Sequence, residues 1–262
     1  MSDQPLIKKI TLGKLDIQQI KDNPLIICIG MRNSGKSTIV LDYLSQHQDI
    51  PCGIVISPTE QFNLTYQNHL PQMFIHEEMN TEILESFIKR QEYQVIKASQ
   101  DPTIDPRAFI VLDDCMADFQ SWTNNKAIQK LFFEKDRLNV TLIITLMDPV
   151  GIPARLRNCI DYIFLCKNTN KTNCKRLFQM YGQMFPDQEH FRATMLNYCD
   201  NFNKLVIHQT VTTATATTDG LKQQVFYYKA NWENTRSFKI CHQKYWEYQE
   251  NIQQGMTNSD EI

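Results

Sequence analysis

The chain has 262 residues, of which 42% are hydrophobic, and its formal net charge is −2. This length and composition suffice for one large α/β domain, or for one domain with a small appendage. The balanced charge lacks the overall basic character typical of nucleic-acid-binding proteins, although it is compatible with a local basic surface. No apolar run approaches the length of a membrane span and the N-terminus lacks a signal-peptide core, so we expect a cytosolic or nuclear protein.

Alternating strands and helices are predicted along most of the chain. A polar, irregular arm covers residues 1–23 and contains a β-like run at residues 7–12. Apolar runs typical of buried strands follow at residues 25–29, 53–57, 74–75, 108–112, 140–146 and 160–166. Helical patterns lie between them at residues 37–44, 81–97 and 122–136. This alternation predicts an α/β fold, in which a mainly parallel central sheet is flanked by helices on both faces.

The pattern changes after Lys167. A pair of helices and then two strand-like runs are predicted at residues 171–183, 188–199, 204–207 and 224–228. The two runs flank a threonine-rich stretch, residues 210–218, which ends in the turn signal Asp219-Gly220. We therefore expect a C-terminal helix pair and a β-hairpin with a long tip.

Three parts of the chain are predicted from these patterns. They are an N-terminal arm at 1–23, a globular domain at 24–240 whose C-terminal helical and hairpin part begins near residue 168, and a polar tail at 241–262. From residue 249 the tail is polar enough that we expect it to fray.

The most informative motif is residues 30–37, Gly-Met-Arg-Asn-Ser-Gly-Lys-Ser, which fits the phosphate-binding loop G-x-x-x-x-G-K-[ST]. A predicted strand precedes it and a predicted helix follows it, which makes a chance match in a glycine turn a poor explanation. The glycines let backbone N–H groups turn toward phosphates, and the helix start adds its positive dipole end. Lys36 is expected to reach the β- and γ-phosphates, and the Ser37 hydroxyl to ligate Mg²⁺. We expect the nucleotide to contact Gly30, Met31, Arg32, Asn33, Ser34, Gly35, Lys36, Ser37 and Thr38.

A second motif places two acids after the strand at 108–112. Asp113 and Asp114 follow this apolar run as the acids of a Walker B motif follow their strand. Asp113 is expected to hold Mg²⁺, directly or through water, and Asp114 to polarise the attacking water. Alone, the pattern also fits a strand that ends in a solvated acidic turn, but the phosphate loop makes the catalytic interpretation the stronger one.

Several arginines are candidates for completing the site. Arg137 precedes the predicted strand at 140–146, and Arg155 and Arg157 follow it. An arginine presented to the γ-phosphate of a neighbouring subunit stabilises charge in the transition state, and we predict this role for Arg137 or Arg157. An ordinary surface or helix-capping role stays open for each of them. Arg107 follows Pro106, and we expect it to be structural.

The cysteines do not suggest a metal site. No two of them form a C-x-x-C pair, and the spacing of Cys159, Cys166 and Cys174 differs from that of zinc sites. Since several others lie in or beside predicted strands, we expect reduced thiols that pack as small hydrophobic groups.

These residues together resemble the DNA-packaging ATPases of large nucleocytoplasmic DNA viruses, relatives of the FtsK–HerA pumping ATPases. The resemblance covers roughly residues 22–240, and its carriers are residues 29–37, 56–59, 111–115, 136–141, 151–164 and 225–230. The run around Arg157 and Asp161 is more specific than the Walker motifs, which many NTPases share. The resemblance implies a RecA/FtsK–HerA-like P-loop fold and a ring-shaped ATPase motor that moves double-stranded DNA into a capsid. It also implies ATP and Mg²⁺ as ligands, a capsid or membrane protein at the packaging vertex as partner, and a place in the host cytoplasm or the virion.

The chain departs from the family pattern at two positions near the strand at 140–146. Leu138 stands where the family usually has a histidine. The strand ends in Thr145-Leu146-Met147-Asp148, without the glutamine that usually senses the γ-phosphate. Thr145 or Asp148 is the candidate substitute.

Two other functions stay open on the sequence alone. A small-molecule kinase also carries a phosphate loop, although we find no arginine-rich lid. A nucleotide-binding switch with little turnover is compatible with the missing glutamine. Two regions are candidates for DNA contacts. One is the threonine-rich hairpin tip, and the other is a basic group formed by Lys167, Lys171, Lys175 and Arg176. These basic residues are also compatible with an ordinary solvated helix face.

Overall fold

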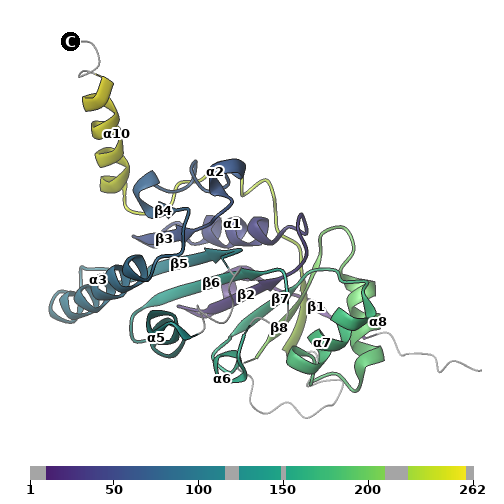
Figure 1. Cartoon of the computed structure of the whole chain (residues 1–262). Coiled ribbons are helices and arrows are strands. Elements are labelled where there is room, and N and C mark those ends of the chain that lie inside the picture. The colour runs from purple at the N-terminus through teal and green to yellow at the C-terminus, as the bar shows by residue number, and fades with distance from the viewer. Residues whose placement is uncertain (1–9, 116–123, 149–151, 210–223, 258–262) are drawn as a thin grey trace, which may run out of the picture.

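A nine-stranded sheet forms the centre of the part of the chain that the structure, a computed structural model, describes (Figure 1). The described residues are 10–115, 124–148, 152–209 and 224–257. In chain order the strands are β1 (Gly13–Lys14), β2 (Leu25–Ile29), β3 (Gly53–Ile56), β4 (Ile75–His76), β5 (Ala108–Asp113), β6 (Val140–Leu146), β7 (Tyr162–Leu165), β8 (Lys204–His208) and β9 (Val225–Tyr228).

The sheet has the order β1-β9-β8-β7-β2-β6-β5-β3-β4. Only β8 runs antiparallel to its neighbours β7 and β9 among the described strands; the other pairs are parallel. The carboxyl ends of β2, β5 and β6 therefore meet at one edge of the sheet, which we call the carboxyl edge. Because Lys204 pairs with Tyr228, the start of β8 and the end of β9 also lie there. We call the opposite edge the amino edge.

Helices cover both faces of the sheet. The helices are α1 (Lys36–Gln46), α2 (Glu60–Asn63), α3 (Thr81–Gln100), α5 (Lys126–Glu134), α6 (Ala154–Arg157), α7 (Lys171–Tyr181), α8 (Gln188–Tyr198) and α10 (Gln243–Thr257), with 3-10 turns η1 (Ile17–Gln19) and η2 (Gln72–Phe74). Figure 1 shows α3 and α5 in front of the sheet and α1 behind it.

Strand β2 shows why the sheet is covered on both faces. Its five residues are all buried, and successive side chains of a strand point to opposite faces. Leu25, Ile27 and Ile29 join the core cluster beneath α3, α5, α6, α7 and α8. Ile26 and Cys28 join the cluster beneath α1. A continuous apolar strand thus needs two helical layers, as a parallel central strand typically does.

The predicted α/β architecture is confirmed. Each predicted strand from residue 25 onward is present within a few residues of its expected bounds, and β8 and β9 pair antiparallel as the expected hairpin. The threonine-rich tip at 210–218 lies outside the described residues. The N-terminal run is shifted, because the strand there is Gly13–Lys14 and residues 10–12 are not part of it. All eight cysteines are free thiols.

The expected frayed tail is wrong for residues 249–257, which belong to helix α10 (Gln243–Thr257). This helix projects away from the body of the molecule (Figure 1). It is attached near its start, where the ring of Tyr245 packs edge-on against Phe74, with centroids 4.9 Å apart. The helix has no strong apolar periodicity, so the sequence pattern did not reveal it.

A polar network holds the amino edge together. Buried Asp161 accepts a hydrogen bond from the backbone N–H of Leu25 at 2.8 Å and forms ion pairs with Lys135 at 3.1 Å and Lys21 at 2.7 Å.

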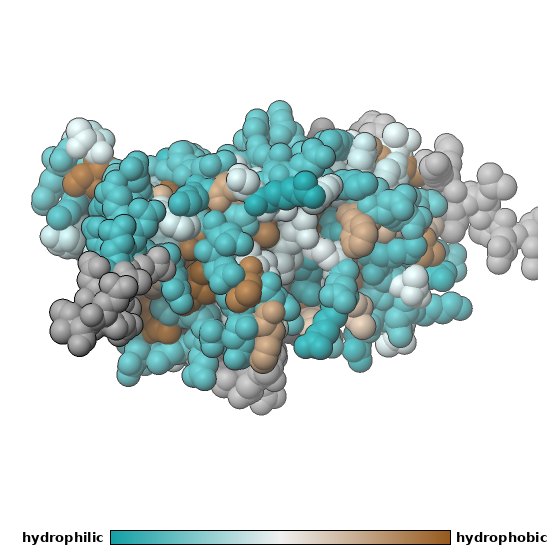
Figure 2. Space-filling model, turned by 90° about the horizontal axis from the view of Figure 1, so that it is seen from above, coloured by the Kyte–Doolittle hydropathy of each residue, from teal (hydrophilic) through white to brown (hydrophobic). Residues whose placement is uncertain are grey.

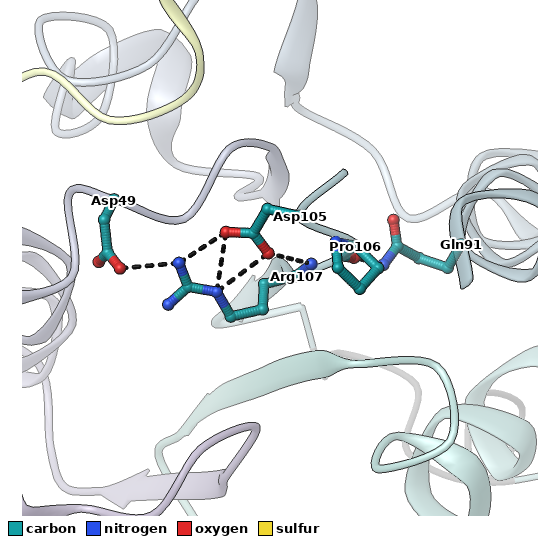
Figure 3. A network of polar contacts seen from close by, with 5 residues as sticks. All are labelled: Asp49, Gln91, Asp105, Pro106 and Arg107. Carbon is teal, nitrogen blue, oxygen red and sulfur yellow. Dashed lines mark hydrogen bonds and ion pairs between the residues drawn. The ribbon is translucent and has the colours of Figure 1, made fainter. Parts of the chain in front are cut away.

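A second polar network fixes the segment before β5 (Figure 3). Arg107 pairs with Asp105 and Asp49, and the hydrogen bonds to Asp105 raise the pKa of its guanidinium. The structural role expected for Arg107 agrees with this geometry.

The face seen in Figure 2 is mostly hydrophilic, and its hydrophobic residues show only as small groups between the polar ones. Among the described residues, no helix is long and apolar enough to cross a membrane.

Candidate nucleotide-binding site

The predicted phosphate loop connects β2 to α1 at the carboxyl edge. Asn33 and Gly35 both adopt left-handed backbone conformations, with φ of 58° and 85°, and Gly35 is the residue that caps the start of α1. Left-handed residues in a tight turn direct successive N–H groups to one side and so create an anion-binding concavity. The loop therefore has a backbone suited to phosphate at a helix N-terminus.

Glycine is required at the start of this loop. A Cβ at Gly30 would lie 2.5 Å from the Cβ of Cys166 and 2.5 Å from the Ser34 hydroxyl oxygen. No side chain fits there without displacing the loop from β7. The Ser34 hydroxyl is buried and has no hydrogen-bond partner among the described residues, which is costly unless a ligand supplies one.

Lys36 is buried in the loop that it is expected to serve. Its ammonium donates to the carbonyl of Gly30 at 3.0 Å and to that of Met31 at 3.2 Å. These neutral acceptors hold the cation beside the loop, and the structure shows no carboxylate paired with it among the described residues. An anion in the concavity thus meets an ammonium group that lacks a negative partner.

Asp113, the last residue of β5, is the centre of the site. It is only 4% exposed, and three hydroxyl groups donate to its carboxylate. Ser37 donates to Oδ2 at 3.0 Å, Tyr66 to Oδ2 at 2.8 Å and Thr145 to Oδ1 at 2.5 Å. Ser37 and Asp113, predicted to share a Mg²⁺ ion, therefore lie within hydrogen-bond distance of each other. Hard oxygen donors of this kind are the ligands Mg²⁺ prefers, so these residues fit the ion.

Tyr66 was not predicted from the sequence. It is fully buried, and burial together with the charge of Asp113 raises the pKa of its phenol, which keeps the hydroxyl as a donor. Glu60 positions it by accepting from the backbone N–H groups of Tyr66 and Gln67 at 2.7 and 3.0 Å. A single tyrosine in a polar segment gives no sequence signal of this role.

Asp114 differs from Asp113 in its exposure, its backbone conformation and its hydrogen bonds. It is partly exposed, and its backbone is left-handed, with φ of 55°, directly after the last residue of β5. Its N–H donates to the Thr145 hydroxyl at 3.0 Å. The structure thus places a hydrogen-bonded acid and a less restricted acid next to each other at the carboxyl edge.

Of the two candidate substitutes for the missing glutamine, only Thr145 joins the acids. It is buried at the end of β6 and contacts both Asp113 and Asp114. Asp148 lies beyond the strand end and is exposed.

A cavity of about 520 Å³ opens over the phosphate loop. This volume is within the range of small-molecule sites. Its lining residues are Asn33, Ser34, Gly35, Lys36, Ser37, Thr38, Phe202, Lys204, Lys229, Ala230 and Trp232. The loop geometry and this cavity together fit a nucleoside triphosphate.

Neither predicted arginine lies at this site within the subunit. Arg137 precedes β6 at the amino edge, where it is 61% exposed and pairs with Glu134 and Glu92. A residue before a parallel strand lies at the edge opposite the carboxyl ends, so Arg137 is remote from the phosphate loop of its own subunit. Arg157 ends α6 and donates to the carbonyl of Ile152 at 2.8 Å. A role for either in a neighbouring subunit stays a prediction.

Of the two candidate DNA-contacting regions, the basic group lies within the described residues and the threonine-rich tip does not. The basic group, Lys167, Lys171, Lys175 and Arg176, is exposed and follows the carboxyl end of β7. By contrast, β8 ends at the amino edge, where His208 pairs with Tyr162, and from there the chain enters the threonine-rich stretch.

Comparison with known proteins identifies relatives of this chain. No family model matches the chain. An uncharacterized protein of Acanthamoeba polyphaga mimivirus is 31% identical over 246 residues, covering 91% of this chain and 85% of that protein. An uncharacterized protein of Invertebrate iridescent virus 6 is 32% identical over 221 residues, covering 83% of this chain and 82% of that protein. The chain belongs to this family of large-DNA-virus proteins. The expected relationship to proteins of large DNA viruses is confirmed.

Solved structures show the same fold at low sequence identity. The genome packaging NTPase B204 of Sulfolobus turreted icosahedral virus 2, in complex with AMP, has a TM-score of 0.54 at 10% identity, over 74% of this chain and 96% of that one. The pCW3 conjugation coupling protein TcpA, with ATPgS, has a TM-score of 0.53 at 11% identity, over 83% of this chain and 62% of that one. Both are P-loop ATPase folds, so the predicted P-loop fold is confirmed.

Proposed function

We propose that this protein is an ATP-hydrolysing motor that translocates double-stranded viral DNA into a capsid during virion assembly. The observation that carries the proposal is the meeting of Ser37, Asp113 and Thr145 beside the phosphate loop. The genome packaging NTPase B204 has the same fold, which supports a role of this chain in DNA packaging.

The residues of the site divide the chemistry of hydrolysis among them. The loop N–H groups and Lys36 bind the phosphates and neutralise charge that grows on the γ-phosphate. Mg²⁺, held by Ser37 and Asp113, supplies further positive charge to the phosphate oxygens. Asp113 accepts three hydroxyl donors and is the acid assigned to the metal ion. Asp114 is the remaining carboxylate, and it accepts the proton of the attacking water.

The motor function requires several copies of the chain. We propose a homo-oligomeric ring on double-stranded DNA, attached to a capsid or membrane protein at the packaging vertex. The proposed location of the ring is the assembly site in the cytoplasm of the host cell. The proposal also includes its retention in the virion. Arg137 or Arg157 completes the site of the next subunit.

The test is ATP turnover by the purified full chain with and without long double-stranded DNA, and with nucleoside acceptors. We expect Mg²⁺-dependent turnover that rises on addition of DNA, together with a ring in the presence of an ATP analogue and DNA. The matched control is Asp114→Asn, which binds nucleotide but is not stimulated. Phosphorylated acceptors would instead indicate a kinase, and binding without turnover would indicate a switch.

A further inference from the structure

The phosphate loop lies between two chemically different parts of the carboxyl edge. In the sheet order, β6 and β5 lie on one side of β2 and carry Thr145, Asp113 and Asp114 at the carboxyl edge. On the other side lie β7, β8 and β9, whose edge carries Phe202 and Trp232. A triphosphate with its γ end toward the acids therefore extends its other end toward the two aromatic residues.

Phe202 is held in an unfavourable backbone conformation beside the loop. It is 66% exposed, and both it and the preceding Asn201 have positive φ values, 62° and 51°. A bulky residue in the left-handed region is an outlier, and such strain gathers at binding sites. A Cβ at Gly35 would lie 3.5 Å from its ring, so the phenyl group packs directly on the phosphate loop. The ring lines the cavity instead of joining the core.

Trp232 reaches the same cavity from the segment after β9. It is 53% exposed, but the turn that carries it is fixed. Buried Asp42 of α1 accepts from the backbone N–H of Asn231 at 2.7 Å and from the Asn234 side chain at 3.3 Å. The guanidinium of Arg236 lies 3.7 Å from the centroid of the indole. Trp232 lines the cavity, whereas Arg236 does not.

A lysine connects the aromatic side of the cavity to the phosphate loop. Lys204 is buried, and a Cβ at Gly35 would lie 3.5 Å from its ammonium nitrogen. The ammonium donates to the carbonyl of Phe202 at 2.8 Å and forms no ion pair with a carboxylate among the described residues. Cys28, Cys166 and Cys199 lie near it, but burial raises the pKa of these thiols and so keeps them neutral. A buried cation at this position is suited to a phosphate oxygen.

We propose that Phe202 and Trp232 form the walls of a nucleobase site, which holds the base of a nucleoside triphosphate while Lys204 contacts its phosphates. This inference rests on the proposed nucleotide site and adds the residues that bind the base. Aromatic faces stack on any base, and purines offer the larger area, so the site favours purine over pyrimidine nucleotides.

The test compares a ligand that has a base with one that lacks it. Calorimetric titration of the full chain uses a non-hydrolysable ATP analogue and inorganic tripolyphosphate, both with Mg²⁺. We expect Phe202→Ala and Trp232→Ala each to weaken binding of the analogue about tenfold while the affinity for tripolyphosphate stays within about twofold. Phe202→Tyr and Trp232→Phe should retain most of the affinity. The control is Phe62→Ala, an exposed aromatic residue on α2 that does not line the cavity.

The possible outcomes separate this inference from the proposed function. If both alanine variants bind the analogue as the parent does, or lose both ligands equally, the nucleobase site is wrong although the phosphate site stands. If the parent binds neither ligand, this inference and the proposed function both fail. Lys36→Ala removes the loop cation and should weaken the binding of both ligands. It therefore shows how large the loss of affinity is when the phosphate site itself is damaged.

Discussion

The Thr145 hydroxyl lies between the two acids of the candidate site. It donates to Asp113 Oδ1 at 2.5 Å and accepts from the backbone N–H of Asp114 at 3.0 Å. One side chain at the end of β6 thus fixes both residues at the end of β5. We interpret Thr145 as the residue that takes over the positioning role at the place where the family usually has a glutamine.

Replacing Thr145 by valine tests this interpretation. Valine has nearly the same shape but leaves Asp113 without one donor and the Asp114 N–H without its acceptor. We expect single-turnover hydrolysis to slow about 10- to 100-fold, as is typical when a supporting hydrogen bond of a metal ligand is lost. The free energy of unfolding should fall by about 1–3 kcal/mol, measured by urea denaturation, because buried polar groups lose partners.

The serine variant is the matched control for Thr145→Val. Serine keeps the hydroxyl and loses only a methyl group, so Thr145→Ser should retain most of the turnover. Equal rates for the parent and the valine variant would show that Thr145 only packs the end of β6.

The two acids should give different defects when each is changed to asparagine. Asp113→Asn weakens the metal site, so we expect a higher Mg²⁺ requirement and weaker binding of Mg·ATP. Asp114→Asn keeps the metal site but removes the proton acceptor, so binding should stay near that of the parent while hydrolysis becomes far slower. Mg²⁺ titrations and single-turnover hydrolysis distinguish the two, and identical profiles would contradict this division of roles.

Lys36→Ala should abolish hydrolysis and weaken ATP binding. The γ-phosphate loses its positive partner, which removes on the order of several kcal/mol of transition-state stabilisation. Steady-state turnover and calorimetric binding measure the two effects. Lys89→Ala, at an exposed position on α3, is the charge-matched control. Near-normal turnover in Lys36→Ala would mean that the loop is not the catalytic site.

The parts of the fold that were predictable are those dictated by local pattern. Strands β2, β5 and β6 are apolar runs that can only be buried on both faces, and the phosphate loop is a contiguous motif. Their carboxyl ends meet because the strands are parallel, which brings Ser37 to Asp113. This part of the candidate site follows from sequence order and elementary topology.

The remaining site residues depend on tertiary contacts that a local pattern does not contain. Tyr66 reaches Asp113 only because Glu60 holds the turn before it, and Trp232 is fixed by Asp42 from a distant helix. Phe202 reads in the sequence as an ordinary apolar residue between polar ones. A role for Arg137 in a neighbouring subunit would depend on contacts between chains, which a local pattern does not contain either.

Lys204→Met should stabilise the protein near neutral pH while weakening nucleotide binding. Burial lowers the pKa of Lys204 from its ordinary value of 10.5. The unfolded chain therefore binds the proton of Lys204 more tightly than the folded chain does. The buried charge lowers the free energy of unfolding by its full amount below the lowered pKa, and this loss disappears as the pH rises toward 10.5. In the parent, the free energy of unfolding should gain a rising component over that window, which the methionine variant lacks. Urea denaturation at several pH values checks this, and equal pH slopes in the two proteins would contradict it.

The last prediction concerns catalysis shared between subunits. Within one subunit Lys36, Lys204 and the two acids supply charges at the site, whereas Arg137 and Arg157 lie away from it. An arginine that completes a neighbour's site makes turnover depend on assembly, so specific activity should fall steeply on dilution. Arg137 is 61% exposed but pairs with Glu134 and Glu92, and Arg157 donates to the Ile152 carbonyl, so each must exchange its present contacts to reach a partner.

Mixing variants separates a trans role from a structural one. An Arg137→Ala or Arg157→Ala subunit keeps its phosphate loop, and a Lys36→Ala subunit keeps its arginines. Mixed rings contain interfaces where an intact loop meets an intact arginine, so combining two inactive proteins should restore turnover at those interfaces. Arg155→Ala, on the same short helix as Arg157, is the control and should stay active alone. Constant turnover per subunit down to a demonstrated monomer, with no rescue on mixing, would mean that each chain is a self-contained NTPase, and the arginines would then serve only the amino edge of their own subunit.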